Sequence, residues 1–489
     1  MVNLIFLSFL CQQLDWPMYM GNPQLTGVFP LGTAAAYDIP PTVKWTRNIP
    51  VGMRSSVAIG NIDSDGEIEV VVASTNGILY VLKGTDGTND WTYSVGSEMW
   101  GAPAIANLDG DPAIEIVVGA DDGILRVLDG ITHAVEWSAQ LDGPVYGSIC
   151  ISDLDNNGSQ EIIVGTGGST GRRSLWAYYG NGTLKWSTSL NRGMYATPSV
   201  KDIDKDGQVE VVMGTYNGDS LYSLNGNTGS IEWGYSSGGT PAFISGATLG
   251  DVTGDDTVDI LIVIKGIETL RCLNGITRRV QWEYKKNGFA LSGNPAIGNV
   301  DASPDIEVLL PLSIGGGIVS PILSIIGGNG SIKHEYPFGT SHYLSYGSPL
   351  LVDVTDNNIL DIVIGTHSGT VHAIRGTGTL IWNNYTFNTD LEGAAAAGDI
   401  DNDGCLDIVG GGYKYESYQR DSLYALEFSC PAKVEEESEK WGLGGINVYP
   451  NPGFGSVAIK FGNKSASPVC VKIYDCTGKI VRSITATPG

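Results

Sequence analysis

The stretch NIDSDGEIEVVVAS, residues 61–74, decides the fold. It places oxygen-bearing side chains at Asn61, Asp63 and Asp65, adds Glu69, and then continues as an apolar β-type run. Carboxylates this close together repel one another unless a cation lies between them or water solvates them. The stretch therefore predicts either a metal-binding loop or a solvated turn at the entrance to a buried strand.

The same nine-residue pattern occurs eight times along the chain. Its copies begin at residues 61, 107, 153, 202, 251, 299, 353 and 399, between 46 and 54 residues apart. A period of this length is typical of propeller blades rather than of helical solenoids. The motifs hold 28 of the 53 acidic residues, so most of the net charge of −25 is local, and bound cations would neutralise it. Because no basic stripe occurs, we expect no nucleic-acid partner.

One repeat predicts one four-stranded blade. The segments 101–108, 114–120, 123–130 and 134–141 are short and β-type, with turn residues between them. A tryptophan recurs in the fourth segment, with Tyr336 in its place in blade six, and we expect it to pack between blades. These tryptophans are Trp91, Trp137, Trp186, Trp233, Trp282 and Trp382.

The two ends of the repeat array predict how the ring closes. The last repeat supplies only three strands and stops at Cys430, while residues 42–48 form an orphan fourth strand. Pairing them would complete blade eight and remove the exposed sheet edges. We therefore predict an all-β chain built around an eight-bladed β-propeller that is closed by its N-terminal and C-terminal strands.

The chain divides into four predicted parts. Residues 1–15 resemble the remnant of a signal peptide, with an ordinary buried N-terminus as the alternative, and their apolar run is too short to span a membrane. The propeller follows over 16–430, and a charged linker follows over 431–445. Residues 446–489 form a separate C-terminal domain. We expect no transmembrane segment.

Several stretches resemble known families. NIDSDGEIEVVVAS and DIDNDGCLDIVGGG resemble FG-GAP repeats of the integrin α type, and GILYVLKGTDGTNDW resembles a repeat of pyrroloquinoline-quinone-type propellers. The tail, with YPNP at 449–452 and KIYDCTGKIV at 472–481, resembles the type A C-terminal sorting domain of type IX secretion. The resemblance implies a truncated immunoglobulin-like β-sandwich and a secreted or cell-surface protein.

The acidic loops predict several calcium ions. Calcium takes six to eight oxygen ligands, and loop positions 1, 3, 5 and 9 supply them, while a glycine at position 6 permits the sharp turn. An EF-hand would need glutamate at position 12, where this chain has an apolar strand residue such as Val72. The predicted ligands are Asn61, Asp63, Asp65, Glu69, Asn107, Asp109, Asp111, Glu115, Asp153, Asp155, Asn157, Glu161, Asp202, Asp204, Asp206, Glu210, Asp251, Asp255, Asp259, Asp353, Asn357, Asp361, Asp399, Asp401, Asp403 and Asp407.

The eight loops are not equivalent. Those beginning at residues 61, 202 and 399 match the pattern fully. Thr253 and Thr355 replace the carboxylate at position 3 in blades five and seven, and Ser303 with Pro304 disrupts the loop of blade six. We expect six loaded loops. The alternative is solvated Asx turns without an ion.

A column of residues seven positions before each motif predicts a ligand site. In FG-GAP propellers the metal loop joins the first and second strands, which implies that the entry to the first strand lies on the opposite face. The long turn at 411–422 belongs to that face too. Aromatic rings beside a few charges suit a glycan or an extended peptide, although they could merely plug the channel. The predicted ligand residues are Arg54, Trp100, Tyr146, Tyr195, Tyr346, Glu392, Tyr413, Tyr415 and Arg420.

Catalysis has little support in the sequence. The five histidines form no HExxH motif, no GxSxG or phosphate loop occurs, and the adjacent cysteine pair of quinone enzymes is missing. We therefore predict a calcium-stabilised, monomeric, non-catalytic binding or adhesion module for glycan or protein ligands. The alternative is a polysaccharide lyase of the rhamnogalacturonan-lyase type, because that family also consists of calcium-bearing eight-bladed propellers.

Overall fold

The chain folds into two compact units, Leu14–Cys430 and a smaller unit made of Met1–Gln13 with Pro431–Gly489. The structure is a computed structural model. It describes residues 3–8, 16–30, 40–50, 52–54, 56–168, 173–190, 192–216, 220–237, 243–291, 293–314, 320–339, 347–387, 391, 393–412, 421–428, 443–449, 458–463, 469–474 and 480–486.

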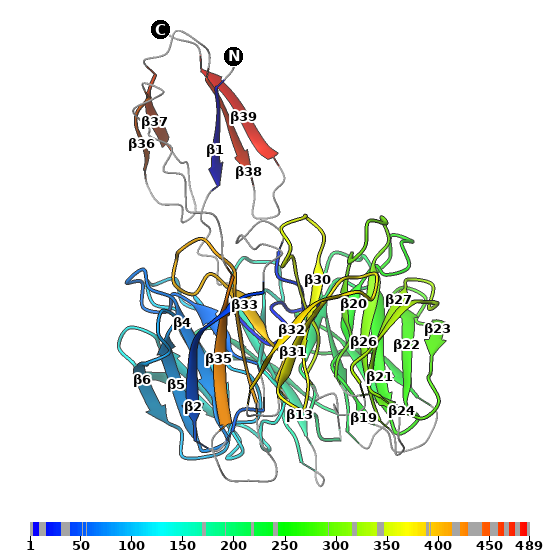
Figure 1. Cartoon of the computed structure of the whole chain (residues 1–489). Helices are drawn as coiled ribbons and strands as arrows, with labels where there is room; N and C mark the ends of the chain where they lie inside the picture. Colours follow the sequence, from blue (N-terminus) through cyan, green and yellow to red (C-terminus); the bar gives the residue numbers. More distant parts are fainter. Residues whose placement is uncertain are drawn as a thin grey trace. The chain divides into compact units, whose positions relative to one another are not determined.

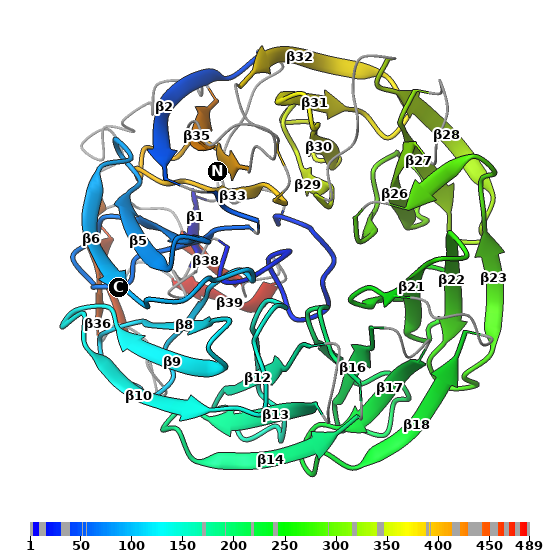
Figure 2. The ribbon, with the colours of Figure 1, turned by 90° about the horizontal axis from the view of Figure 1, so that it is seen from below.

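The larger unit is a ring of eight antiparallel sheets, the blades (Figures 1 and 2). Blade 1 contains β3 (Ala58–Gly60), β4 (Glu69–Ala73), β5 (Ile78–Lys83) and β6 (Asn89–Ser94), and blade 2 contains β7 (Ala104–Ala106), β8 (Glu115–Gly119), β9 (Ile124–Asp129) and β10 (Val135–Gln140). Blade 3 contains β11 (Cys150–Ser152), β12 (Glu161–Gly165), β13 (Ser174–Tyr179) and β14 (Leu184–Ser189), and blade 4 contains β15 (Ser199–Lys201), β16 (Glu210–Gly214), β17 (Ser220–Asn225) and β18 (Ile231–Ser236).

The second half of the ring repeats this plan, with a short additional strand in blades 5 and 6. Blade 5 contains β19 (Phe243–Ile244), β20 (Thr248–Gly250), β21 (Asp259–Lys265), β22 (Thr269–Asn274) and β23 (Val280–Tyr284), and blade 6 contains β24 (Phe289–Leu291), β25 (Ala296–Gly298), β26 (Glu307–Ile314), β27 (Ile322–Gly327) and β28 (Ile332–Pro337). Blade 7 contains β29 (Leu350–Val352), β30 (Asp361–Gly365), β31 (Thr370–Ile374) and β32 (Leu380–Thr386), and blade 8 contains β33 (Ala396–Gly398), β34 (Asp407–Gly411), β35 (Asp421–Glu427) and β2 (Thr42–Ile49).

Burial explains the sequence of each blade. The second strands, such as β8 with the sequence EIVVG, are buried along their whole length because other blades pack on both of their faces. The outer strand β10 instead alternates between half-buried and exposed residues. A strand covered on both faces therefore has a continuous apolar sequence, and a strand at the rim has an alternating one.

The predicted closure of the ring is confirmed. β2 pairs in antiparallel fashion with β35 from Thr42 opposite Glu427 to Ile49 opposite Asp421. In Figure 1 the blue β2 lies beside the orange β35. The two ends of the repeat array thus share blade 8, and the main-chain hydrogen bonds between them leave no open gap between the first and last blades.

The fourth-strand tryptophans link neighbouring blades, as predicted. Trp45 Nε1 donates a hydrogen bond of 2.7 Å to the carbonyl of Gly84, and Trp186 Nε1 donates one of 2.7 Å to Gly226. In each pair the acceptor belongs to the next blade. The expectation for blade 6 was wrong, because the strand register places His334, not Tyr336, at the tryptophan position opposite Ile325.

The segment from Trp16 to Phe29 lies inside the ring, which the sequence did not predict. Figure 2 shows it in dark blue at the centre of the blades. Innermost strands donate main-chain hydrogen bonds to it, from Ile59 to Trp16 O and from Leu249 to Gln24 O, for example. Since an innermost strand has no further sheet neighbour, this segment satisfies donors that would otherwise need water.

The smaller unit contains two small sheets among its described residues. β1 (Asn3–Ser8), β38 (Val469–Tyr474) and β39 (Ile480–Ala486) form a three-stranded sheet, in which β1 pairs with β38 in parallel. β36 (Leu443–Tyr449) pairs with β37 (Ala458–Asn463). The residues described in this unit are therefore all in β-strands, and its immunoglobulin-like sandwich stays a prediction.

Candidate functional site

Each acidic loop joins the first strand of a blade to the second and folds around its first side chain. In blade 4, Asp202 Oδ1 accepts a hydrogen bond of 2.7 Å from Lys205 N, and Asp202 Oδ2 accepts one of 3.1 Å from Gly207 N. Lys205 has φ of 64° and Gly207 has φ of 89°. The sixth position favours glycine because the loop needs this left-handed backbone there.

The acid at position 9 has a second role that the sequence did not indicate. In all eight blades one of its oxygens accepts a hydrogen bond from the backbone N–H of position 2. The lengths run from 2.5 Å at Glu115 to 3.2 Å at Asp361. These side chains lie at the start of the buried second strands and are themselves buried. Position 9 therefore fastens the loop to its blade with one oxygen, and the other oxygen can bind a second partner, as Glu307 Oε1 binds Lys333.

Carboxylate oxygens converge in these loops. Among the described residues there are six groups of potential metal ligands in which one ligand atom from each residue lies within 4.8 Å of the others. Five of them are Asp63, Asp65 and Glu69; Asp109, Asp111 and Glu115; Asp153, Asp155 and Glu161; Asp202, Asp204 and Asp206; and Asp399, Asp401 and Asp407. These clusters can hold ions, and their hard oxygen donors suit calcium.

Two buried oxygens test whether the donor set fits a cation. Glu115 Oε1 and Glu210 Oε1 have no hydrogen-bond partner, and both side chains are fully buried. A buried carboxylate oxygen without a donor is costly, and a cation would satisfy it. In blades 2 and 4 the residues therefore fit a bound ion.

Burial also changes the protonation of these groups when no cation is bound. It raises the pKa of Glu69, Glu115 and Glu210 to about 8, and the neighbouring loop carboxylates add to the shift. The pKa of Asp407 is also raised to about 8 by burial. A divalent cation would favour the ionised form of the same groups, so protons and metal compete for these loops.

In blades 5 and 7 the threonine at position 3 bonds to the closing acid of its own loop. Thr253 Oγ1 donates a hydrogen bond of 3.0 Å to Asp259, and Thr355 Oγ1 donates one of 2.9 Å to Asp361. Asp259 also accepts from Gln281 Nε2. The closing carboxylates of these loops are thus already bonded to neutral protein donors. They would therefore gain less free energy from binding a cation.

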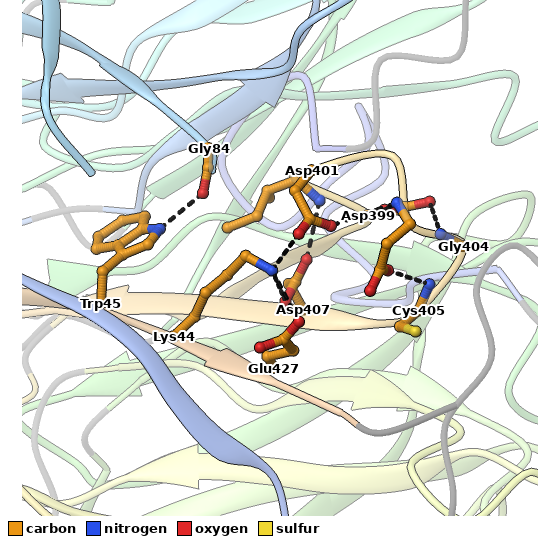
Figure 3. Close-up of polar contacts among 11 residues, drawn as sticks. Lys44, Trp45, Gly84, Asp399, Asp401, Gly404, Cys405, Asp407 and Glu427 are labelled. Atoms are coloured by element: carbon orange, nitrogen blue, oxygen red, sulfur yellow. Dashed lines mark hydrogen bonds and ion pairs between the residues drawn. The ribbon is translucent and has the colours of Figure 1, made fainter. Parts of the chain in front are cut away.

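Three lysines reach into acidic loops, and sequence reasoning missed them. In Figure 3 the Lys44 ammonium lies among Asp401, Asp407 and Glu427. Lys185 and Lys333 take the same place in blades 3 and 6. The signal was present in the sequence, because each of these lysines directly precedes the tryptophan position of its fourth strand.

A pocket of about 210 Å³ lies at the other end of the innermost strands. The acidic loops follow these strands, whereas the pocket residues precede them, so the two sites occupy opposite faces of the ring. Four predicted ligand residues line it together: Arg54, Trp100, Tyr146 and Tyr195. The other five predicted ligand residues, Tyr346, Glu392, Tyr413, Tyr415 and Arg420, lie outside the described residues.

The aromatic residues of the pocket form a continuous row. The Arg54 guanidinium lies 4.3 Å from the centre of the Trp100 ring. Trp100 meets Tyr146 edge-on at 5.6 Å, and Tyr146 stacks on Tyr195 at 4.9 Å with an interplanar angle of 15°. Tyr216 extends the row at 4.6 Å from Tyr195. The row combines flat apolar faces with a cation at one end.

Further polar groups line the same pocket. Burial lowers the pKa of Lys265, and burial together with Asp121 raises the pKa of Tyr146 to about 12. Tyr19 comes from the segment inside the ring and shares a hydrogen bond of 3.0 Å with Ser348. Neither Tyr19 nor Lys265 was predicted, because their place depends on how the ring closes around the N-terminal segment.

Family comparisons agree with this arrangement. The FG-GAP-like repeat matches residues 153–212 and 202–262, and the outer membrane protein assembly factor BamB family matches residues 42–174. The secretion system C-terminal sorting domain matches residues 447–488. No helix that could cross a membrane occurs among the residues that the structure describes.

Solved structures share the fold at low sequence identity. A quinohemoprotein alcohol dehydrogenase from Comamonas testosteroni has a TM-score of 0.65 at 14% identity, over 86% of this chain and 82% of that chain. The V. cholerae biofilm matrix protein Bap1 has 0.60 at 13% identity, over 81% and 92%. BamB from Moraxella catarrhalis has 0.54 at 17% identity, over 79% and 100%. No curated protein sequence matches significantly.

Such identities establish the fold and leave function open. The tail is more informative, because a sorting domain of this kind directs a protein to secretion or to the cell surface. The chain is a secreted or cell-surface protein that carries FG-GAP-like repeats, a BamB-like region and a type IX secretion C-terminal sorting domain on an eight-bladed β-propeller.

Proposed function

We propose that the chain is a non-catalytic binding protein of the cell exterior that holds a glycan in the aromatic pocket of its propeller. The observation that carries this proposal is the row of Arg54, Trp100, Tyr146 and Tyr195 along one pocket. Sugar rings have an apolar face that stacks on aromatic side chains, and their hydroxyl groups bond to polar groups at the rim. A surface-attached protein with such a pocket would serve adhesion.

The charges of the pocket favour an acidic glycan over a neutral one. Arg54 and Lys265 both line it, and a carboxylate on the sugar would neutralise them. More than half of the acids of the chain lie in the loops on the opposite face. Two acids do lie beside the aromatic row, Glu98, which accepts a hydrogen bond of 3.2 Å from Trp100 Nε1, and Asp121 next to Tyr146. The V. cholerae biofilm matrix protein Bap1 provides a precedent for this fold in a protein of the cell exterior.

Calcium is part of the same proposal, with a structural role. The ions would bind in the acidic loops, on the face opposite the pocket, and would hold the blades in shape. An exported protein meets calcium at concentrations that loops of moderate affinity can use. Cys405 is disulfide-bonded, which also suits an oxidising exterior.

Binding to a panel of acidic and neutral polysaccharides tests the proposal. We expect the full chain in calcium to bind an acidic member, and Trp100→Ala to weaken this binding at least about tenfold, the value of one lost stacking contact. Trp176→Ala is the matched control, because Trp176 lies half-buried on β13 and does not line the pocket. The proposal fails if both variants fold and bind alike, or if the panel yields no ligand.

A polysaccharide lyase is the second candidate, and Lys265 is the observation that favours it. Its lowered pKa would supply more neutral amine, which can take the proton next to a uronate carboxylate. Arg54 would neutralise that carboxylate while the glycosidic oxygen leaves and a carbon–carbon double bond forms. Appearance of unsaturated uronates, followed by their ultraviolet absorbance, and its loss in Lys265→Met would establish the lyase and overturn the non-catalytic proposal.

A further inference from the structure

The residue before the fourth-strand tryptophan position points toward the acidic loop of its own blade. In blade 3 this residue is Lys185, whose ammonium lies 2.5 Å from Asp155 and 3.5 Å from Glu161. In blade 6 it is Lys333, which lies 3.1 Å from Asp301 and 2.6 Å from Glu307. Each lysine therefore contacts an acid at position 3 and the closing acid at position 9.

Blade 8 repeats this arrangement with a lysine from the other end of the chain. Lys44 on β2 pairs with Asp401, lies 3.0 Å from Glu427 and lies 3.9 Å from Asp407 (Figure 3). Its side chain is only 8% exposed. The ammonium thus occupies the part of the loop from which the two inner acids would reach a metal ion.

Blades 1, 2 and 4 carry an acid at the same position. The residues are Asp90, Glu136 and Glu232, so this position supplies a carboxylate instead of an ammonium. In blade 1 Lys83 lies 3.9 Å from Asp90 and 3.2 Å from Glu67, but no ion pair joins it to Asp63 or to Glu69 among the described contacts. In blades 2 and 4 the closing acids Glu115 and Glu210 are fully buried, and each keeps one oxygen without a hydrogen-bond partner. In blade 8 the position-9 oxygen Asp407 Oδ1 also has no hydrogen-bond partner, but there the Lys44 ammonium lies 3.9 Å away and balances its charge.

An ammonium and a divalent cation exclude each other from one loop. Both would bind the same carboxylate oxygens, and two cations a few ångströms apart in a half-buried site repel strongly. A carboxylate that already pairs with lysine also has less charge to offer a metal. The residue before the tryptophan can therefore decide whether a loop needs a metal.

We propose that this single position divides the loops into two classes. In blades 1, 2 and 4 the loops hold tightly bound divalent cations, whereas in blades 3, 6 and 8 the lysines serve as built-in counter-ions and replace the metal. Blades 5 and 7 hold at most weak sites, because threonine hydroxyl groups already bond to their closing acids. The chain then binds about three ions tightly rather than six.

Metal content measures this division directly. We expect the full chain, dialysed against micromolar calcium, to retain about three ions by plasma mass spectrometry. Lys185→Met should raise the count by one, since it removes the charge but keeps the length, and Glu232→Lys should lower it by one. Lys286→Met is the matched control, because Lys286 pairs with Glu335 on β28, outside the loops.

Thermal unfolding without metal provides a second readout. In chelator, Glu232→Lys should melt at a higher temperature than the parent chain, and Lys185→Met should melt lower and recover in calcium. If Lys185→Met does not fold in chelator, Lys333→Met serves instead, because Lys333 is 25% exposed. Six tightly bound ions in the parent chain, or unchanged counts in folded Lys185→Met or Lys333→Met and in Glu232→Lys, would overturn the proposal.

Discussion

At the scale of single residues, glycines at the end of the third strand allow the blades to approach closely. A Cβ atom on Gly328 would lie 1.7 Å from the carbonyl oxygen of Val252, the second residue of the preceding blade's acidic loop. Gly84 meets Ile400 O at 2.0 Å in the same way. The reason for glycine here is the backbone of the neighbouring blade, so an acidic loop and the next blade are in direct contact.

We predict that Gly328→Ala destabilises the propeller by about 2 kcal/mol or more, because a backbone atom has to move to make room. Gly234→Ala is the control, since its Cβ would meet the Tyr222 ring at 3.5 Å and Leu221 O at 3.8 Å, which are ordinary contacts. Denaturant unfolding of both variants in calcium measures the difference. Equal stability would show that the blades can separate at no cost.

The buried tryptophans allow a comparison between a satisfied and an unsatisfied ring nitrogen. Trp186 Nε1 bonds to Gly226 O, whereas Trp91 Nε1 is buried without a hydrogen-bond partner. Trp186→Phe should therefore cost about 1–3 kcal/mol more than Trp91→Phe, because it also leaves a buried carbonyl unpaired. Melting curves in calcium test this order, and a larger loss for Trp91→Phe would contradict it.

At the scale of elements, the segment from Trp16 to Phe29 acts as an inner lining of the ring. Its apolar side chains Trp16, Met20 and Leu25 are almost completely buried. Main-chain bonds join it to the innermost strands of several blades. It therefore contributes both core volume and hydrogen bonds that no single blade can provide.

Leu25→Ala should cost about 2–5 kcal/mol, the usual loss when a fully buried leucine is truncated. Gln24→Ala should cost about 1 kcal/mol, since it removes one hydrogen bond from its side chain to Val200 O. Unfolding in denaturant compares the two. A loss at Leu25 no greater than that at Gln24 would mean that the segment only rests in the channel.

At the scale of the whole molecule, the loops concentrate negative charge on one face of the ring. Removal of calcium should lower the melting temperature, and each site filled at one hundred times its Kd contributes about 2.7 kcal/mol. Asp204→Ala should therefore cost more calcium-dependent stability than Asp301→Ala, because Lys333 already pairs with Asp301. Calorimetry with chelator and with calcium measures both. Identical curves in the two conditions would exclude a structural role for the ion.

Lowering the pH should stabilise the metal-free chain. Folding raises the pKa of Glu115 and Glu210 from 4.5 to about 8, so the folded state binds more protons than the unfolded state between these values. The free energy of unfolding therefore falls as the pH rises through this range. Resin-treated protein should melt higher at about pH 5 than at about pH 8, and saturating calcium should remove this trend. A melting temperature that rises with pH in the metal-free chain would contradict the burial of these acids.

The sequence by itself determined the blade, the number of blades and the acidic loops. These features are local, because the ligands of one loop lie within nine consecutive residues and each of blades 1 to 7 occupies one repeat. The column of Arg54, Trp100, Tyr146 and Tyr195 was also predictable, since equivalent positions of successive blades meet around one axis.

Tertiary structure alone decided what surrounds these features. Lys44 meets Asp401 across 357 residues, and Tyr19 and Lys265 enter the pocket from an inner segment and from a strand end. The lysine position before the tryptophan recurs in three blades, but only closure of the ring brings Lys44 to Asp401, and no periodic pattern records the contacts of Tyr19 and Lys265. The repeat therefore specifies where a loop or an aromatic ring lies, and the closed ring decides which residues from distant parts of the chain meet it.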